Sequence, residues 1–308
     1  MSIRKLLAYA AIYILWGGSF LGIREIVAVT PPFFAAGFRF TLAGLLLVGY
    51  SYLRGRTEMP RGSLVGASTL GFIMFMLMYA ALFWGEIRVP SGIAAVISAM
   101  IPVWIFMGEL ALLRTQKATA LSVIGVVLGF VGVVVLAWQA PISHSGSGAR
   151  ASTLAVLVLI GGTLCWSGGT LLSRRLTLPR PQTLNAGLQM AIGGVLLFLL
   201  SALTGEMRRL PPLEVLLRPM LILSMAYLVF CASILAFTAY VWLIAHEPMT
   251  RVASYAYVNP VIALFAGAVL AGERLSAFQM IGVLLVLAGV FATLTGKQVV
   301  PAARKVAV

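Results

Sequence analysis

Few side chains in this sequence could carry out acid–base or metal chemistry. All eight acids are glutamates, and the two histidines are His144, in a polar stretch, and His246, near the end of an apolar run. Glu109 is the one acid clearly inside an apolar run, and it lies toward one end of that run. Metal-dependent prenyl or phosphoryl transfer needs clustered carboxylates, and histidine-based hydrolysis needs a suitably placed histidine. The residues therefore argue against an enzyme, and we expect no catalytic residues, metal or cofactor.

Binding suits the remaining polar and aromatic residues better. Trp16, Ser19 and Phe20 lie at i, i+3 and i+4, which places them on one face of a helix. Aromatic faces can pack the apolar part of a solute and hold an ammonium group by cation–π attraction. We expect a substrate cavity, and its candidate residues are Trp16, Ser19, Phe20, Arg39, Tyr79, Phe83, Trp166, Gln189, Tyr240, Tyr255, Tyr257 and Asn259.

Each candidate also has a structural interpretation. The aromatic residues could simply pack against other helices, or form a belt at the membrane interface. Arg39 could clamp a substrate carboxylate, could bond the carbonyls of a helix end, or could pair with Glu86 or Glu109. Tyr257 and Asn259 flank Pro260, and we expect a ligand-facing role for Tyr257 and a structural role for Asn259.

The composition places these residues in a membrane. Hydrophobic residues make up 61% of the chain and charged residues 10%, with a mean hydropathy of +1.04, whereas soluble domains carry roughly 25% charged residues. The net charge of +14 is spread between apolar runs, which fits loops facing anionic lipid headgroups better than a nucleic-acid surface. Ten apolar runs are long enough to cross a bilayer, at about 6–23, 31–53, 63–85, 90–112, 118–138, 152–173, 182–204, 219–245, 250–271 and 276–296.

The second half of the chain repeats the first. Trp16 matches Trp166 at an offset of 150, and Pro102 matches Pro260 at an offset of 158. Each repeat has five spans, an odd number, so the second repeat enters the membrane from the opposite side. The sequence therefore predicts an all-α integral membrane protein whose ten transmembrane helices form two inverted five-helix repeats. The expected divisions are a first repeat at 1–138, a linker at 139–151, a second repeat at 152–296 and a cytoplasmic tail at 297–308.

Two further expectations follow from this arrangement. Pro102 and Pro260 lie within spans four and nine, so both helices should kink there and act as hinges. Lys and Arg residues number fourteen on the side of the termini and seven on the other side. Because cytoplasmic loops carry the excess of basic residues, both termini should be cytoplasmic.

The order of these motifs resembles the drug/metabolite transporter superfamily, in its ten-helix branch with two EamA-type repeats. The resemblance rests on Trp16-Gly17-Gly18-Ser19-Phe20, on Arg39 after Pro31-Pro32, on Pro102 and Asn259-Pro260, and on Gly272-Glu273-Arg274 before Ile281-Gly282. It covers residues 6–296, and it is greatest to the amino-acid and metabolite exporters of the YddG type. The first half departs from the pattern, because Leu113-Arg114-Thr115-Gln116 stands where the second half has Gly272-Glu273-Arg274.

The resemblance and the cavity residues together predict a transporter of a bacterial-type inner membrane. It would export small amphipathic metabolites, including aromatic amino acids, by alternating access. With no acid or histidine in the middle of a span, we expect facilitated transport or exchange and not proton coupling. The alternatives are a proton-driven drug or metabolite carrier, a passive pore and an intramembrane lipid-modifying enzyme. The expected partners are a small-molecule substrate, an amino acid or metabolite, and the lipid bilayer, with no nucleic acid. We expect a monomer or weak homodimer.

Overall fold

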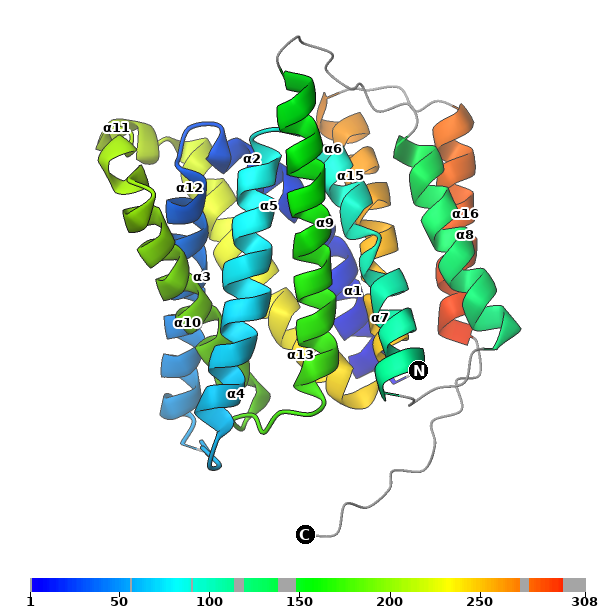
Figure 1. Ribbon diagram of the computed structural model, residues 1–308, viewed down its shortest axis with the longest axis horizontal. Helices are drawn as coiled ribbons and strands as arrows, with labels where there is room; N and C mark the ends of the chain where they lie inside the picture. The colour runs from blue at the N-terminus through cyan, green and yellow to red at the C-terminus, as the bar shows by residue number, and fades with distance from the viewer. Residues whose placement is uncertain are drawn as a thin grey trace.

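The computed structural model describes residues 2–55, 57–89, 91–113, 119–137, 148–271 and 277–295. These ranges are almost wholly helical, and Figure 1 shows the long helices running side by side between two opposite faces of the molecule. The short elements η3 (Glu206–Arg209) and α11 (Leu213–Leu216) lie between the seventh and eighth crossing segments. In the described part of the chain, the crossing segments are α1 (Ile3–Gly17) with α2 (Ser19–Val27); α3 (Pro32–Leu53); α4 (Ser63–Leu70) with η1 (Gly71–Leu77) and α5 (Met78–Glu86); α6 (Ser91–Ser98) with α7 (Ile101–Gly108) and η2 (Glu109–Leu113); α8 (Ala120–Ala137); α9 (Gly148–Ser173); α10 (Gln182–Leu203); α12 (Pro219–Ala226) with η4 (Tyr227–Leu235) and α13 (Ala236–His246); α14 (Met249–Ala253) with α15 (Tyr255–Ala271); and α16 (Ala277–Thr295).

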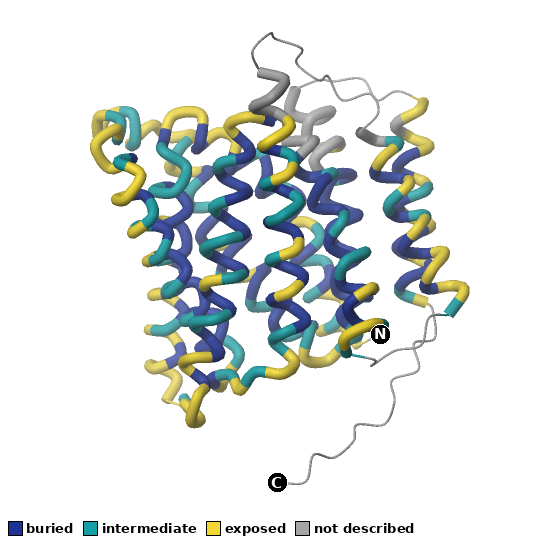
Figure 2. Tube along the Cα trace, in the orientation of Figure 1, coloured by how far each residue is buried: buried dark blue, intermediate teal, exposed yellow. Residues whose placement is uncertain are grey.

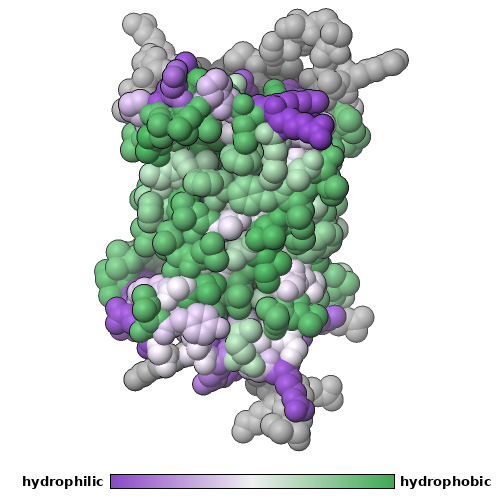
Figure 3. Space-filling view, turned by 90° about the vertical axis from the view of Figure 1, so that its left-hand side faces the viewer, coloured by the Kyte–Doolittle hydropathy of each residue, from purple (hydrophilic) through white to green (hydrophobic). Residues whose placement is uncertain are grey.

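The outer surface of this bundle suits a bilayer. Seven of the crossing segments are long and apolar enough to span a membrane, and Ala120–Val135 and Met280–Thr295 are shorter apolar helices. Large apolar side chains such as Leu45, Leu199 and Leu284 are exposed on the outside. Figure 3 shows the result as a broad apolar band between two more polar ends. Such an extended apolar surface would be a liability in water, and it is what lipid tails contact.

The two halves pack on each other through matching glycines in α3 and α10. A β-carbon added to Gly44 would lie 2.3 Å from the Ala191 nitrogen, and one added to Gly194 would lie 2.4 Å from the Thr41 nitrogen. Gly44 and Thr41 correspond to Gly194 and Ala191 at the repeat offset of 150. The contact is therefore reciprocal, which is the mark of a twofold relation. Only glycine permits this close approach of the two backbones.

A second reciprocal contact joins α8 and α16. A β-carbon on Gly132 would lie 2.6 Å from the Val286 nitrogen, and one on Gly289 would lie 2.4 Å from the Gly129 nitrogen. In both helix pairs the contacting residue number falls on one helix as it rises on the other; thus Gly187 meets Val48. The paired helices are antiparallel, so the twofold axis lies across them. This arrangement confirms the predicted inverted repeats.

The ends of the segments agree with ten crossings. α1 begins and α16 ends at the same face of the molecule, whereas α8 ends and α9 begins at the opposite face (Figure 1). We call these the terminal face and the far face. Residues 139–147 of the expected linker and the Gly272-Glu273-Arg274 turn lie outside the described residues.

The helices of spans four and nine are interrupted ahead of their prolines. The break in span four lies at Ala99–Met100, before Pro102 in the first turn of α7. In span nine the break lies at Ser254, and Pro260 stands inside α15. The hinge role of the two prolines stays a prediction. Figure 2 shows that buried positions line the interior of the bundle, where these breaks occur.

Candidate substrate cavity

Aromatic rings from both halves meet at the centre of the bundle. The ring of Trp16 lies 4.5 Å from that of Tyr255, 5.2 Å from that of Tyr240 and 5.7 Å from that of Trp166, measured between centroids. Trp16 and Trp166 are repeat counterparts, so their contact places the cluster on the pseudo-twofold axis. Trp16 Nε1 donates to the Ala232 carbonyl oxygen at 2.8 Å, which fixes the orientation of the indole.

A cavity of about 40 Å³ lies beside this cluster. We call it the small cavity. Ser19 Oγ donates to the Trp16 carbonyl oxygen at 2.7 Å, and Asn259 Oδ1 is buried without a hydrogen-bond partner. The volume is about that of one water molecule, so this conformation excludes an organic solute from the centre. Its lining comprises Trp16, Ser19, Phe20, Met78, Tyr79, Leu82, Ser98, Ile101, Trp166, Tyr255 and Asn259.

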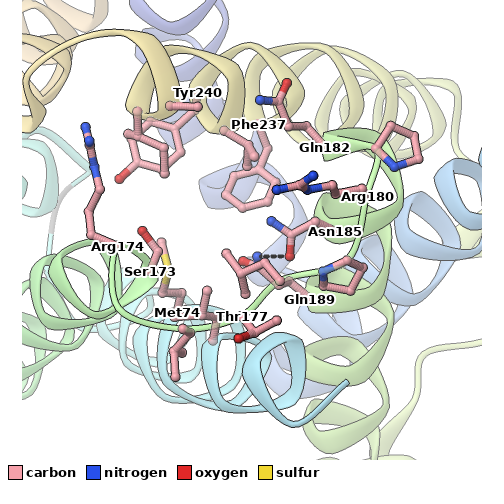
Figure 4. Close-up of a pocket in the computed structure, with 18 of the residues that line it drawn as sticks. Met74, Ser173, Arg174, Thr177, Arg180, Gln182, Asn185, Gln189, Phe237 and Tyr240 are labelled. Carbon is pink, nitrogen blue, oxygen red and sulfur yellow. Dashed lines mark hydrogen bonds between the residues drawn. The ribbon is translucent and has the colours of Figure 1, made fainter. Parts of the chain in front are cut away.

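A much larger cavity of about 750 Å³ extends from the terminal face toward the same cluster. We call it the vestibule. Its mouth is bordered by the 174–182 segment that joins α9 to α10, and its inner end by Phe237 and Tyr240 (Figure 4). Its lining mixes polar and cationic side chains with aliphatic and aromatic ones. The polar members labelled in Figure 4 are Ser173, Arg174, Thr177, Arg180, Gln182, Asn185 and Gln189.

Two buried amides stand on the vestibule wall, on successive turns of α10. Gln189 Nε2 donates to Asn185 Oδ1 at 2.8 Å. This bond uses a donor of Gln189 and the side-chain oxygen of Asn185. It leaves the Gln189 oxygen Oε1 and the Asn185 nitrogen Nδ2 free. Neither Gln189 Oε1 nor Asn185 Nδ2 is among the buried polar atoms without a partner in the described residues. Since no hydrogen bond is seen for them either, both atoms reach the vestibule and offer one acceptor and one donor to a solute.

Arg174 stands at the mouth of the vestibule. Its Nη2 donates to the Glu247 carbonyl oxygen at 2.9 Å, which ties the end of α9 to the end of α13. Partial burial lowers the pKa of the Arg174 guanidinium, and nearby Glu109 opposes this shift. An arginine remains protonated at physiological pH even so, so the mouth carries a fixed positive charge that attracts anions.

A layer of aromatic rings separates the vestibule from the small cavity. The Trp166 ring lies 5.4 Å from the ring of Tyr240 and 6.2 Å from that of Phe237. The Tyr240 hydroxyl is hydrogen-bonded to Thr170 Oγ1 at 2.6 Å. Trp166 Nε1 is buried without a hydrogen-bond partner. The protein is thus open toward the terminal face and closed beyond the aromatic layer.

Arg39 lies on the closed side of that layer. It is 1% exposed, and its Nε donates to Ser233 Oγ at 2.9 Å. Its guanidinium carbon lies 4.6 Å from the Phe40 ring centroid and 5.4 Å from that of Tyr79, while Nη1 has no hydrogen-bond partner. Arg39 forms no ion pair with Glu86 or with Glu109 in the described part of the chain.

The two glutamates considered as partners of Arg39 have different surroundings. Glu109 accepts hydrogen bonds from the Thr250 nitrogen at 3.0 Å, from the Met249 nitrogen at 3.3 Å and from Thr250 Oγ1. It thereby caps the first turn of α14 from the opposite repeat. Glu86 is 0% exposed, and neither of its carboxylate oxygens has a hydrogen-bond partner.

The predicted site residues fall into four groups. Trp16, Ser19, Phe20, Tyr79, Trp166, Tyr255 and Asn259 line the small cavity, and Gln189 and Tyr240 line the vestibule. Arg39 and Phe83 are buried toward the far face, with the Phe83 ring 6.4 Å from that of Tyr79. Tyr257 lies apart from both cavities, since it packs against Gly129 of α8 and donates to the Val126 carbonyl oxygen at 3.1 Å.

Sequence reasoning missed Asn185, Phe237 and Arg174. Two signals could have found Asn185 and Phe237. Asn185 lies one helical turn before Gln189, on the same face. Phe237 is the repeat counterpart of Tyr79 at the offset of 158.

Comparison with known proteins identifies the family. The EamA-like transporter family matches this chain twice, at residues 4–138 and 153–295. The chain belongs to this family. Its two matches coincide with the two structural repeats, and it is a membrane transporter of the drug/metabolite transporter superfamily and not an enzyme.

Individual EamA relatives extend the comparison. The inner membrane transporter YedA of Escherichia coli K12 is 32% identical over 98% of this chain and 95% of its own length. A probable amino-acid metabolite efflux pump of Salmonella typhimurium is 26% identical, covering 95% of each chain. A crystal structure with 19% identity superposes with a TM-score of 0.74 over 95% of this chain and 96% of the other, which supports the fold alone. This EamA protein is therefore a multi-pass inner membrane protein.

Proposed function

We propose that this EamA transporter exports small amphipathic solutes that carry a carboxylate and an amino group, among them aromatic amino acids. The vestibule carries the proposal. It joins the free edge of the Asn185–Gln189 amide pair to an apolar end formed by Phe237 and Tyr240. A similar function is in the name of the Salmonella relative, a probable amino-acid metabolite efflux pump.

The chemistry of the vestibule matches the two parts of such a solute. The free amide donor of the Asn185–Gln189 pair suits a carboxylate, and its free acceptor suits an ammonium group. A solute that carries both groups is neutral overall. The rings of Phe237 and Tyr240 would pack the side chain. Arg174 and Arg180 at the mouth favour entry of an anionic or zwitterionic solute. The vestibule of about 750 Å³ also falls within the usual range for small-molecule sites.

Transport would proceed by alternating access. The solute enters from the terminal face, which we take as cytoplasmic. The aromatic layer at Trp166 and Tyr240 then opens as the helices move apart on the side of the far face. The substrate's own gradient, or exchange for another solute, would drive the cycle. This proposal favours a carrier over a passive pore, because the small cavity of about 40 Å³ closes the path in this conformation.

Transport assays in proteoliposomes test the proposal. Labelled tryptophan, phenylalanine and leucine would be compared with tryptamine, which lacks the carboxylate, and with indole-3-propionate, which lacks the ammonium group. We expect saturable uptake of the amino acids, stimulated by unlabelled amino acid on the other side, and weaker uptake of both analogues. Flux that rises linearly with concentration would indicate a pore, and absence of flux for every solute would contradict the substrate class.

A pair of matched variants links the result to the vestibule. Gln189→Leu keeps the volume of the side chain but removes its amide, which costs about 1–3 kcal/mol of binding, or roughly 5–150-fold in half-saturation concentration. Gln182→Leu makes the same change at the mouth, away from the amide pair. Equal effects of the two variants would show that the amide pair does not bind the solute.

A further inference from the structure

The inverted repeats allow the vestibule to be mapped onto the closed half of the molecule. When the two repeats exchange conformations, a vestibule should open at the far face. Its lining should consist of the repeat counterparts of the residues that line the present vestibule. The offsets are 150 for α9 and α10 and 158 for η4 and α13. The counterparts of Gln189, Phe237 and Ile244 are then Arg39, Tyr79 and Glu86.

A hydrogen bond at each end of the molecule supports this mapping. Arg174 Nη2 donates to the Glu247 carbonyl oxygen at 2.9 Å near the terminal face. Arg24 Nη1 donates to the Val89 carbonyl oxygen at 3.1 Å near the far face. Arg24 and Arg174 differ by 150, and Val89 and Glu247 differ by 158. The same bond is present at the open end and at the closed end, so the correspondence extends to both mouths.

The closed half contains polar atoms that this conformation leaves without partners. Both carboxylate oxygens of Glu86 and Nη1 of Arg39 are buried and make no hydrogen bond. No ion pair forms between Glu86 and a basic residue in the described part of the chain, although Arg24 Nη1 of α2 donates to the Glu86 carbonyl oxygen at 3.0 Å. Burying an unpaired charge is costly. The counterparts of Arg39 and Glu86 at the open end, Gln189 and Ile244, carry no charge.

We propose that Arg39 and Glu86 line a second vestibule, open to the far face in the alternate conformation, and bind a zwitterionic solute there. The guanidinium of Arg39 takes the carboxylate, as arginine can do with two parallel hydrogen bonds. The carboxylate of Glu86 takes the ammonium group. Tyr79, the counterpart of Phe237, packs the side chain of the solute. The solute class rests on the proposed function, whereas the existence of the second vestibule does not.

Thiol accessibility tests the second vestibule without knowledge of the substrate. Phe83 lies on the closed side, and its counterpart Val241 lines the open vestibule. Each is replaced by cysteine in a background carrying Cys165→Ser and Cys231→Ser, which removes both native cysteines. A charged, membrane-impermeant methanethiosulfonate is applied to spheroplasts and to inside-out vesicles. Ala303→Cys in the C-terminal tail marks the terminal face.

The expected pattern is opposite for the two positions. Val241→Cys should react from the face that labels Ala303→Cys, and Phe83→Cys from the other face. Reaction of Phe83→Cys from the terminal face, or no reaction from either face while Val241→Cys is labelled, would overturn the proposal. Labelling after denaturation and size-exclusion elution confirm that both variants are folded and contain the thiol.

Two variants that remove one charge each test the solute chemistry. Arg39→Gln introduces the residue found at the counterpart position, and Glu86→Gln removes the charge alone. Each should raise the half-saturation concentration for an amino acid added at the far face by about 10–150-fold, since a hydrogen bond to a charged group contributes about 1.5–3 kcal/mol. The half-saturation concentration for an amino acid added at the terminal face should change little. If the two residues had only a structural role, this difference between the two faces would not be expected. Arg218→Gln, an exposed arginine that begins α12, controls for net charge.

The analogues assign each residue to its group. Glu86→Gln should leave the affinity for indole-3-propionate unchanged, because that solute has no ammonium group. Arg39→Gln should likewise leave the affinity for tryptamine unchanged. Equal loss for all solutes, or from both faces, would overturn the assignment of Arg39 and Glu86 as binding residues. If no solute in the panel is transported, the proposed function fails, and the labelling pattern alone decides whether the second vestibule exists.

Discussion

Glu109 offers the sharpest test of a structural role, because its carboxylate joins the two repeats. It lies in η2 of the first repeat and accepts hydrogen bonds from the Met249 and Thr250 nitrogens of α14 in the second. Glu109→Ala leaves both backbone donors buried without this acceptor. Each such donor costs about 1–3 kcal/mol, so we expect a loss of about 2–6 kcal/mol in the free energy of unfolding.

The assay is thermal unfolding of detergent-solubilised protein, followed by fluorescence-detected size exclusion. The loss should lower the apparent melting temperature by roughly 4–18 °C at about 2–3 °C per kcal/mol. Glu109→Gln retains one acceptor oxygen and should lose less than half as much. Glu214→Ala removes an equal charge from exposed α11 and should shift stability by less than about 0.5 kcal/mol.

Two results would refute this reasoning. If Glu109→Ala melts at the temperature of Glu214→Ala, then α14 does not depend on this cap. If Glu109→Gln keeps its stability but loses uptake driven by a pH gradient, then Glu109 is a coupling acid and not a cap.

Four further predictions follow from the fold. Cysteines at Ser145 and Ala303 should be labelled from opposite sides of the membrane, with Ala303 cytoplasmic; labelling of both from one side would contradict ten crossings. Replacing Pro102 and Pro260 together by alanine should change transport kinetics more than melting temperature, and unchanged kinetics would show that the prolines are not hinges. Flux at equal substrate concentration should respond weakly to an imposed pH or sodium gradient between about pH 6 and 8, where histidine normally titrates; uphill accumulation would establish ion coupling. Gly44→Val should prevent folding or lower the melting temperature strongly, because its β-carbon would lie 2.3 Å from the Ala191 nitrogen; expression and melting should stay normal for Gly49→Val, since nothing lies within 4 Å of that position.

Hydropathy predicted the crossing segments well because the bilayer itself fixes their length. The span expected at 182–204 is α10 (Gln182–Leu203), and that expected at 63–85 ends at Glu86. The inverted repeat was also readable, since five spans per half is an odd number. What hydropathy could not show is where a helix is interrupted. Span nine breaks at Ser254, whereas Pro260 stands inside the helix α15.

The centre of the site was predictable in part. Trp16 and Trp166 were candidates through the repeat, and the structure brings their rings together. Tyr255 and Asn259 are four residues apart and share a helix face, whereas Tyr257 points away from that face. Helical periodicity could therefore have separated Tyr257 from its neighbours. The surroundings of Arg39 could not be read from sequence, because Glu86 and Glu109 were both available as partners, whereas tertiary packing places its Nε on Ser233 Oγ.

The distribution of charge between the repeats has an energetic consequence for the proposed cycle. In this conformation the closed half buries Arg39 and Glu86, which form no ion pair in the described residues, whereas Gln189 and Ile244 line the open vestibule. In the exchanged conformation water would reach the two charged groups, and the closed half would bury an amide and an alkyl side chain instead. Burial of charge costs more than burial of either. The charge asymmetry therefore favours the conformation that is open toward the far face. The conformation open toward the terminal face is populated only when other contacts, such as the aromatic layer between Trp166 and Tyr240, offset the cost of burying the two charged groups.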